Sequence, residues 1–468
     1  MQLCWFRNDL RIQGNPALAN ALKLGPTCAM YIATPDQWKL HNDAHIKLDF
    51  WRRNLAALEQ ELLQLGVDLL YFEVRDYKQI PELITGILSQ LEISHLHYNR
   101  EYPINELRRD RAVEVVCKDA EVNVSSFDDQ LLFSPDSLLN QSGLPFKVFT
   151  PFAKKALSLI QDNSRLHTSP THQQSGIPKK SKITLRRLQY QCELADIEWP
   201  DPVSNWEEDW PAGEREASKR LSEFSRQRIS TYKHDRDIPG YDSTSKLSPY
   251  LNSGILSIND CWRNAQDFFD NSGVESWRGE LLWREYYRHI VIHFPHVCMH
   301  KAYRDNLGHV PWRHDKTQFD KWCNGETGYP LVDAGMRQLR ETGWMHNRLR
   351  MITAMFLSKH LLIDWRWGER WFMQNLIDGD LASNNGGWQW SASTGVDAVP
   401  YFRIFSPTRQ SRRFDSEGAF IRQYLPELAK LSDKAIHEPE DPGQLGYLQP
   451  IIEHSFARDR ALNAFKAP

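Results

Sequence analysis

The chain has 468 residues, of which 41% are hydrophobic, and a formal net charge of −3. At roughly 100–200 residues per domain this length predicts two to three globular domains, and the near-neutral charge excludes a uniformly basic nucleic-acid-binding protein. The seven cysteines form no CxxC pair and the seventeen histidines show no HExxH or paired metal spacing, so we predict neither a disulfide framework nor a metal site.

The start of the chain and its hydropathy argue against export and membrane insertion. The sequence opens into QLCWFRNDL without a signal-peptide pattern, and it contains no uninterrupted apolar run of about 18 residues. We therefore expect a cytoplasmic protein that spans no membrane. Tryptophan is frequent, with 17 residues. Its common uses are core packing, sugar platforms, and aromatic surroundings for a flavin or for bases.

Residues 1–127 alternate between two kinds of segment. In Phe50–Gly66 four leucines recur on one helical face, which predicts an amphipathic helix. These leucines are Leu55, Leu58, Leu62 and Leu65. Apolar runs of strand length separate such stretches, at Leu3–Phe6, Thr27–Ile32, Asp68–Val74, Ser94–Tyr98 and Val122–Phe127. This alternation predicts a Rossmann-like α/β domain with a parallel sheet.

The predicted sheet has no phosphate-binding fingerprint. No GxGxxG follows the first strand and no GxxxxGK[ST] occurs, which disfavours a nicotinamide site or a P-loop. Ligands of open parallel sheets lie at the carboxyl ends of the strands. The residues near those ends that we expect to line a cleft are Thr34, Trp38, His41, Asn99, Asn105 and Glu106.

The chain changes character after residue 127. Residues 128–205 form a linker in which Pro, Ser, Gln and Lys dominate Gln161–Lys182, which predicts a long, partly flexible connection over the surface. From Trp206 strand signals disappear and helical periodicity takes over. We predict an all-α domain over residues 206–468.

Within the helical half, Leu376–Trp390 (LIDGDLASNNGGWQW) concentrates short polar side chains, glycines and two tryptophans. Glycines let backbone approach a planar ligand, and the carboxylates and amides offer hydrogen bonds to a heteroaromatic edge. The alternative is a surface turn with two core tryptophans. The polar side chains are Asp378, Asp380, Asn384 and Asn385, and the indoles are Trp388 and Trp390.

Two other segments carry candidate groups at helical spacing. In SWRGELLWREYYRH, Glu280 and Trp283 lie one turn apart, so one face can hydrogen-bond and stack a planar base; the alternative is a solvated amphipathic helix. In GWMHNRLRMIT, Arg350 is a candidate ion-pair partner for a loop aspartate; the alternative is a solvated arginine at a helix start.

Residues 403–413 (RIFSPTRQSRR) contain four arginines and no acid. In a chain of slightly negative charge such a local basic run is typical of a phosphate-binding patch, with a solvated loop as the alternative. We find neither a serine nucleophile elbow nor a carboxylate dyad, so the sequence shows no hydrolytic site.

Nine segments together resemble the DNA photolyase/cryptochrome family, in its order and spacing. They are WFRNDLRI, YIATPDQW, TSKLSPYLNSGILS, ELLWREYYRH, GYPLVDAGMRQL, GWMHNRLRM, DWRWGERWF, DGDLASNNGGWQW and PYFRIFSP. Within the family the chain is most similar to microbial class I cyclobutane pyrimidine dimer photolyases. The resemblance implies an α/β antenna domain, a wrapped linker and a helical domain that binds FAD.

The resemblance also assigns roles to single residues. It implies FAD contacts by Tyr232, Thr244, Ser245, Lys246, Leu247, Ser248, Trp277, Asn347, Arg350, Asp378, Asp380 and Asn384. Lys246 stands where an arginine is common. Asn384 would face flavin N5, where an amide can donate and an ionised carboxylate would repel a reduced, anionic flavin.

The mechanism implied by the resemblance is electron transfer. Excited FADH⁻ would pass an electron to the dimer, the cyclobutane bonds would split, and the electron would return, so the cofactor performs the difficult step. Trp388, Trp365 and Trp312 match the family's electron-transfer chain. Glu280, Asn384 and Met351 are the implied catalytic residues.

The implied substrate is DNA containing a pyrimidine dimer, bound by a monomer. Photolyases are a known example of enzymes that flip their target out of the duplex, at a cost of a few kcal/mol. Stacking on aromatic rings offsets this by roughly 1–3 kcal/mol per base. The implied DNA contacts are Arg236, Glu280, Trp283, Asn347, Arg348, Met351, Trp390 and Arg403.

The antenna position resembles that of enzymes using 5,10-methenyltetrahydrofolate. His41, Asn105 and Glu106 match the folate-binding positions. A lysine that often assists from the helical domain is replaced by Met299, with Lys301 two residues on. We expect the folate as antenna, with weaker or altered binding.

Two alternatives to repair remain open. One is a cryptochrome-like blue-light photoreceptor, which often lacks the asparagine found at Asn384 and carries a long C-terminal tail. Met351 favours cyclobutane dimers as the substrate. Family members that repair (6-4) photoproducts look to have a histidine at this position for proton transfer, and a methionine cannot transfer a proton. The other alternative is a tryptophan-rich carbohydrate-binding protein, which the arginine run at 403–413 disfavours.

Overall fold

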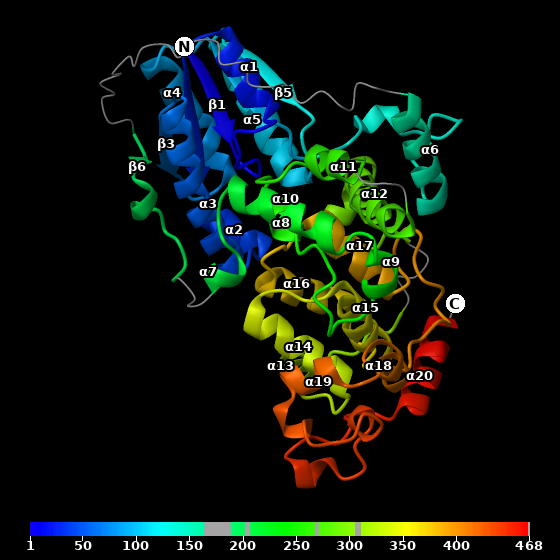
Figure 1. Ribbon diagram of the computed structural model, residues 1–468. Helices are drawn as coiled ribbons and strands as arrows, with labels where there is room; N and C mark the ends of the chain where they lie inside the picture. Colours follow the sequence, from blue (N-terminus) through cyan, green and yellow to red (C-terminus); the bar gives the residue numbers. More distant parts are fainter. Residues whose placement is uncertain (163–188, 202–205, 267–270, 305–309, 467–468) are drawn as a thin grey trace.

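The structure is a computed structural model that describes residues 1–162, 189–201, 206–266, 271–304 and 310–466 (Figure 1). Its N-terminal half is built on one sheet with the order β5-β4-β1-β2-β3-β6. The strands are β1 (Gln2–Phe6), β2 (Thr27–Ala33), β3 (Leu69–Glu73), β4 (His95–Asn99), β5 (Asn123–Phe127) and β6 (Gln191–Cys192). The first five pair in parallel, which confirms the predicted α/β sheet.

The sheet has one strand that the sequence did not indicate. Strand β6 comes from the predicted linker and runs antiparallel to the edge strand β3. It is two residues long, too short to show the period-two alternation by which strands are recognised.

Helices connect the parallel strands on both sides of the sheet. They are α1 (Pro16–Leu24), α2 (Pro35–His41), α3 (His45–Gln64), α4 (Ile80–Gln90) and α5 (Ile104–Asp119). Helix α3 covers most of the predicted amphipathic stretch Phe50–Gly66, but it begins five residues earlier and ends at Gln64. Leu55, Leu58 and Leu62 are buried as expected, whereas Leu65 is half-buried because it caps the helix end.

Part of the predicted linker is a packed helix. Helix α6 (Phe149–Asp162) buries Phe152 and Ala156. The Phe152 ring contacts Tyr286 and His289 of the helical half. Residues 163–188 lie outside the described residues, so the predicted connection over Gln161–Lys182 stays a prediction, as do the domain boundaries at 127 and 205.

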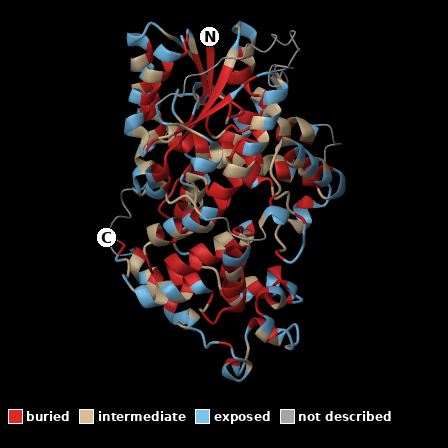
Figure 2. Ribbon diagram, turned by 90° about the vertical axis from the view of Figure 1, so that its left-hand side faces the viewer, coloured by how far each residue is buried: buried red, intermediate tan, exposed pale blue. Residues whose placement is uncertain are grey.

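The C-terminal half is helical, and no strand occurs among its described residues. Its helices are α7 (Trp206–Asp209), α8 (Glu214–Gln227), α9 (Tyr232–Asp235), α10 (Ser248–Asn252), α11 (Ile258–Gln266), α12 (Ser272–His293), α13 (Lys316–Asn324), α14 (Pro330–Thr342), α15 (Asn347–Met355), α16 (Trp365–Asn375), α17 (Leu381–Ser391), α18 (Pro407–Phe414), α19 (Ala419–Tyr424) and α20 (His454–Lys466). Buried residues form the sheet and the helix faces that pack against one another (Figure 2). Within the described ranges no helix is long and apolar enough to cross a membrane.

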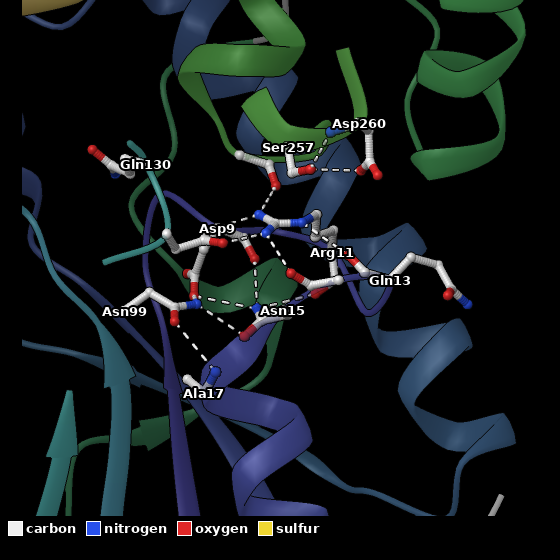
Figure 3. Close-up of polar contacts among 12 residues, drawn as sticks. Asp9, Arg11, Gln13, Asn15, Ala17, Asn99, Gln130, Ser257 and Asp260 are labelled. Atoms are coloured by element: carbon white, nitrogen blue, oxygen red, sulfur yellow. Dashed lines mark hydrogen bonds and ion pairs between the residues drawn. The ribbon is translucent and has the colours of Figure 1, made fainter. Parts of the chain in front are cut away.

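A buried polar junction joins the two halves (Figure 3). The Arg11 guanidinium, 1% exposed, donates to Asp129 at 2.9 Å and to the backbone carbonyl of Gly254 in the helical half at 2.9 Å. Asn99 donates to Asp9 at 2.6 Å and accepts from the Ala17 N–H. Asn99 therefore holds the start of α1 and does not line the cleft for which we predicted it. The junction fixes how the halves face each other.

Candidate functional site

The segment Leu376–Trp390 is only partly the loop that the sequence indicated. Asp380 caps α17 by accepting hydrogen bonds from the backbone N–H and hydroxyl of Ser383, at 3.0 and 2.7 Å. Residues 381–391 are helical, since a good N-cap outweighs the poor helix propensity of asparagine and glycine. Lys47 and Asn252 both donate to the Gly379 carbonyl, at 2.8 and 2.9 Å. The remaining loop is thus held from both halves of the molecule.

Asp378 and Arg350 form the predicted ion pair. Arg350 Nη2 lies 3.0 and 2.8 Å from the two carboxylate oxygens of Asp378, so that prediction is confirmed. The Asp378 side chain is 3% exposed and that of Arg350 is 25% exposed. A second N–H of Arg350 donates to the Met345 carbonyl. Helix α15 and the loop before α17 are fastened together here.

Asp380 lies against two arginines of α12. Arg288 is 3.3 Å from its carboxylate. Burial alone would raise the pKa of Asp380, but Arg288, Ser383 and Arg284 together lower it. Arg284 itself has its pKa lowered to about 9 by burial and by the neighbouring Arg288. Asp380 is therefore held as a carboxylate at neutral pH.

Asn384 and Asn385 are both tied to Glu369 of α16. Asn384 Nδ2 donates to the Glu369 carbonyl oxygen at 2.9 Å, and Asn385 Nδ2 donates to its carboxylate at 2.7 Å. Gly387 lies one turn after Asn384, and a Cβ placed on it would meet nothing within 4 Å. The same is true of Gly279 on α12. The oriented amide of Asn384 and the carboxylates of Asp378 and Asp380 offer hydrogen bonds that suit the edge of a planar ring system such as a flavin.

Most of the predicted phosphate and ribose contacts lie just before or at the start of α10, and Tyr232 begins α9. Among the described residues, the hydroxyls of Tyr232, Thr244, Ser245 and Ser248 make no side-chain hydrogen bond, so they are available to a phosphate or sugar. Tyr232 and Trp277 both pack on Phe224, with ring centroids 5.5 and 5.2 Å apart. These donors suit the diphosphate arm of FAD.

Lys246, between Ser245 and Leu247, is engaged in contacts within the protein. It adopts a left-handed backbone conformation, with φ of 49°. Its ammonium pairs with Asp242 at 2.9 Å and lies 5.8 Å from the Trp344 ring. Lys246 and Ser245 line a second cleft of about 530 Å³. The charge of Lys246 is thus already paired within the protein.

The predicted DNA contacts form a cluster of charged side chains at one end of α12. Glu280 is 2.5 Å from Arg236, and Arg348 is 2.7 Å from Asp237. The guanidinium of Arg348 also reaches the Met351 sulfur at 3.8 Å. Burial raises the pKa of Glu280, while Arg236 opposes the shift. The structure thus brings together Arg236, Glu280, Arg348 and Met351.

The remaining predicted DNA contacts lie on α15, on α12 and in and after α17. Asn347 is exposed at the first turn of α15, four residues before Met351. Trp283 and Trp390 are half-buried, and Arg403 is exposed on the turn after α17. The arginine run is less uniformly basic than predicted, because Arg412 pairs with Glu438 at 2.9 Å.

The three predicted electron-transfer tryptophans run from the interior outwards. Trp388 and Trp365 are 2% and 0% exposed, and both indole N–H groups lack a hydrogen-bond partner among the described residues. Trp312 is only partly buried. The Arg313 N–H donates to the Leu362 carbonyl at 2.7 Å, which brings the segment after Trp312 beside the segment before Trp365.

A cleft of about 290 Å³ lies between the two halves. It is lined by His41, Asn105 and Glu106, as predicted, and also by Thr34 and Trp38. Asn105 and Gln37 lie 3.1 and 2.8 Å from the same imidazole nitrogen of His41. His300, not Met299 or Lys301, completes the helical side. No signal in the sequence pointed to His300, which lies in a left-handed backbone turn with φ of 56° and has an exposed side chain 3.4 Å from Glu369.

Glu106 is the unusual group of this cleft. Its Oε1 accepts from the Tyr77 hydroxyl at 3.3 Å, whereas its buried Oε2 has no partner among the described residues. Burial raises the pKa of Glu106, and Glu101 adds to the shift. An unpartnered buried acceptor fits a ligand that donates N–H bonds, as the ring edge of a pterin does.

Comparison with known protein families decides what these sites belong to. Residues 2–173 match the DNA photolyase family, and residues 277–467 match the FAD binding domain of DNA photolyase. The chain belongs to the DNA photolyase family. The second match makes FAD the cofactor of the helical half, and the resemblance predicted from sequence motifs is confirmed.

The relatives of this photolyase-family chain match it over its whole length. The deoxyribodipyrimidine photo-lyase of Vibrio cholerae is 41% identical, covering 100% of this chain and 99% of the relative. That of Escherichia coli is also 41% identical, covering 99% and 98%. Among solved structures, a class III photolyase from Agrobacterium tumefaciens has a TM-score of 0.82 at 34% identity, covering 99% and 96%. A Synechocystis cryptochrome has a TM-score of 0.83 at 28% identity, covering 99% of both chains.

Three residues with central positions were not found from the sequence. Glu369 joins Asn384 and Asn385 to the cleft between the halves, where its carboxylate lies 3.4 Å from His300. Arg288 holds Asp380, and Phe149 of α6 stacks on Trp283. For Glu369 and Arg288 the only available signal was a charged residue inside an apolar helical pattern, and such a signal does not reveal which residue it pairs with.

Proposed function

We propose that this chain is a deoxyribodipyrimidine photo-lyase that splits cyclobutane pyrimidine dimers in DNA under light. The observation that carries the proposal is the full-length identity of 41% to enzymes of that name. When bound, reduced FAD supplies the light-excited electron that opens the cyclobutane ring. The contribution of the protein is to position, enclose and charge-match the two reacting molecules.

On the cofactor side, we assign the ring edge of the flavin to the α15–α17 corner. Asp378, fixed by Arg350, offers a carboxylate to ring N–H donors, and the Asn384 amide is oriented by its bond to Glu369. An amide beside the ring does not repel a reduced, anionic flavin as a carboxylate would. The hydroxyls near α10 are assigned to the diphosphate.

On the substrate side, we assign the lesion to the space between α12, α15 and α17. Trp283 and Trp390 would stack the flipped bases and exclude water, Glu280 would hydrogen-bond a base edge, and Met351 would pack beside it. Arg236 and Arg348 would exchange their present carboxylate partners for phosphates. This exchange is inexpensive because both ion pairs are partly solvated, with side chains 17–35% exposed.

Trp388, Trp365 and Trp312 are assigned to electron transfer between flavin and surface. The full burial of Trp388 and Trp365 and the partial exposure of Trp312 support an exit at Trp312. For the cleft between the halves we propose 5,10-methenyltetrahydrofolate as antenna, supported by the unpartnered Glu106 oxygen. A cytoplasmic location and a monomeric state stay predictions.

The second candidate is a blue-light photoreceptor without repair activity. It has a specific basis, since the Synechocystis cryptochrome shares the fold with a TM-score of 0.83. Fold therefore does not separate the two functions. The amide at Asn384 and the thioether at Met351 favour repair of cyclobutane dimers.

The deciding experiment is repair of a thymine-dimer oligonucleotide by the chemically reduced protein, in blue light and in a dark control. Light-dependent recovery of thymines is expected. A protein that holds reduced flavin and yet restores no thymines would contradict the proposal and favour the photoreceptor. An otherwise identical reaction on a (6-4) photoproduct tests the assignment based on Met351, and we expect no repair there.

A further inference from the structure

The linker helix α6 stacks an aromatic ring on one of the two tryptophans assigned to the lesion. The rings of Phe149 and Trp283 are 3.7 Å apart at their centroids with an interplanar angle of 9°. This face-to-face contact is as close as stacked rings approach, so it leaves no room for a base on that side of the indole. Tyr286 and Tyr287 border Trp283 at 5.7 and 5.6 Å.

Phe149 is itself fixed from the turn that follows α17, the helix that carries the other tryptophan. Its backbone N–H, one of the donors left unpaired at a helix start, donates to the carboxylate of Asp397 at 3.0 Å. Asp397 lies in the turn after α17, and two residues later the Val399 N–H donates to the Trp390 carbonyl at 3.3 Å. The start of α6 thus connects the surroundings of Trp283 with those of Trp390.

The rest of α6 anchors this contact. One turn after Phe149, the 1% exposed Phe152 packs against Tyr286 and His289 of α12. Glu285 of α12 is 0% exposed and accepts from the backbone N–H groups of Leu132 and Phe133, at the start of the linker. The segment before Phe149 and the first turn of α6 are therefore both attached to α12, and Phe149 is not a loosely held side chain.

We propose that Phe149 is a positioning residue for lesion recognition. By covering one face of Trp283 it holds the indole plane and leaves only the opposite face for a flipped base. A ring that is already ordered loses less side-chain entropy when a base stacks on it, and ordering one such side chain on binding costs about 0.5–1.5 kcal/mol, or roughly two- to twelvefold in affinity. This inference rests on the proposed function, which places the lesion at Trp283.

The test is dark binding of FAD-loaded protein to a thymine-dimer oligonucleotide and to the undamaged oligonucleotide. Phe149→Leu keeps the apolar volume but removes the ring, and we expect about two- to twelvefold weaker binding of the dimer with undamaged DNA bound as before. Phe149→Tyr keeps the ring and is expected to bind like the unaltered protein. Phe152→Leu is the matched control, because it loosens α6 without touching Trp283.

A double-mutant cycle with Trp283→Ala completes the test. Phe149→Leu should cause no further loss once the indole is gone. Equal dimer binding by Phe149→Leu would overturn the inference. Tighter dimer binding by this variant would also overturn it, because the Phe149 ring would then occupy the position where the lesion binds. Equal losses in Phe149→Leu and Phe152→Leu would also overturn it. If Trp283→Ala alone binds the dimer normally, the proposed function fails at this residue; if it binds weakly while Phe149→Leu does not, only this inference fails.

Discussion

Two groups of paired charges differ in burial: one lies at the cleft between the halves, and the other lies beside Glu280 of α12, where we propose that the lesion binds, and is called the lesion face. In the cleft, Arg7 and Arg109 pair with Glu101 and Asp110, and all four side chains are 3–9% exposed. At the lesion face, Arg236 pairs with Glu280 and Arg348 with Asp237, with side chains 17–35% exposed. Buried pairs are costly to separate, whereas partly solvated ones exchange partners easily.

This difference matches two kinds of ligand. A cleft whose charges are already fixed suits a chromophore that stays bound, because nothing has to rearrange when it enters. A face of exchangeable ion pairs suits DNA that arrives and leaves at every turnover. Asp237 and Glu280 then keep the arginines in place between substrates. Four measurements break or sharpen this comparison, from the largest expected effect to the smallest.

The ion pair of the flavin corner should behave as a buried pair. Asp378→Ala leaves Arg350 without its partner, and we expect a loss of about 3 kcal/mol in the free energy of unfolding, the lower end of the range for buried pairs because Arg350 is 25% exposed. We also expect loss of bound FAD. Denaturant unfolding of the FAD-free proteins measures the first, and the ratio of flavin to protein absorbance measures the second.

The matched control for that pair is Glu438→Ala, which breaks the Arg412–Glu438 pair. Its side chains are 51% and 66% exposed, so a change of about 0–1 kcal/mol is expected. Similar losses of unfolding free energy in Asp378→Ala and Glu438→Ala would show that burial does not distinguish the two ion pairs.

A buried carboxyl at the junction should make stability depend on pH. Burial raises the pKa of Asp9 from 3.8 to about 6. The folded protein then holds this proton more tightly than the unfolded chain, so the contribution of Asp9 to stability falls as pH rises from about 4 to about 6. The expected loss is about 3 kcal/mol. The measurement is the difference in unfolding free energy between the unaltered protein and Asp9→Asn across this range. A difference that stays flat would show that Asp9 is ionised throughout.

A substitution at Glu106 in the cleft between the halves should weaken binding of the proposed folate without affecting the flavin. Glu106→Gln removes the charge but keeps the shape, and the loss of a charged hydrogen bond of about 1.5–3 kcal/mol should weaken folate binding by roughly 10- to 150-fold. Titration with methenyltetrahydrofolate measures the affinity, and flavin absorbance confirms that FAD is retained. The exposed Glu82→Gln is the control. Unchanged folate affinity would place the chromophore elsewhere.

The smallest effect is expected at the exposed end of the lesion face. Arg403→Ala should weaken the binding of damaged and of undamaged DNA to a similar extent. It should also reduce the slope of log affinity against log salt concentration by about one. Arg412→Ala, in the same arginine run, should change the slope less because Arg412 already pairs with Glu438. A loss confined to damaged DNA would instead make Arg403 a lesion contact.

Local pattern predicted the elements of this protein well. Strand lengths, the leucine face of α3 and the helical second half follow from hydrophobic periodicity, which is a property of neighbouring residues. The family and its cofactor could also be inferred from motif order. These signals come from neighbouring residues or from comparison with a family. They can therefore be recognised without knowing how the two halves pack together.

Tertiary structure alone decided the contacts that orient the site. The sequence, through the family resemblance, implied the pairing of Arg350 with Asp378 that the structure shows. It did not indicate that Glu369 joins the asparagines of α17 to His300, that Lys246 turns toward Asp242, or that Phe149 covers Trp283. Each of these contacts joins segments remote in the chain, apart from Lys246 and Asp242, whose pairing depends on a left-handed backbone at Lys246. Residue type alone cannot say which of several partners lies within reach, because the chain path brings one of them close and removes the others.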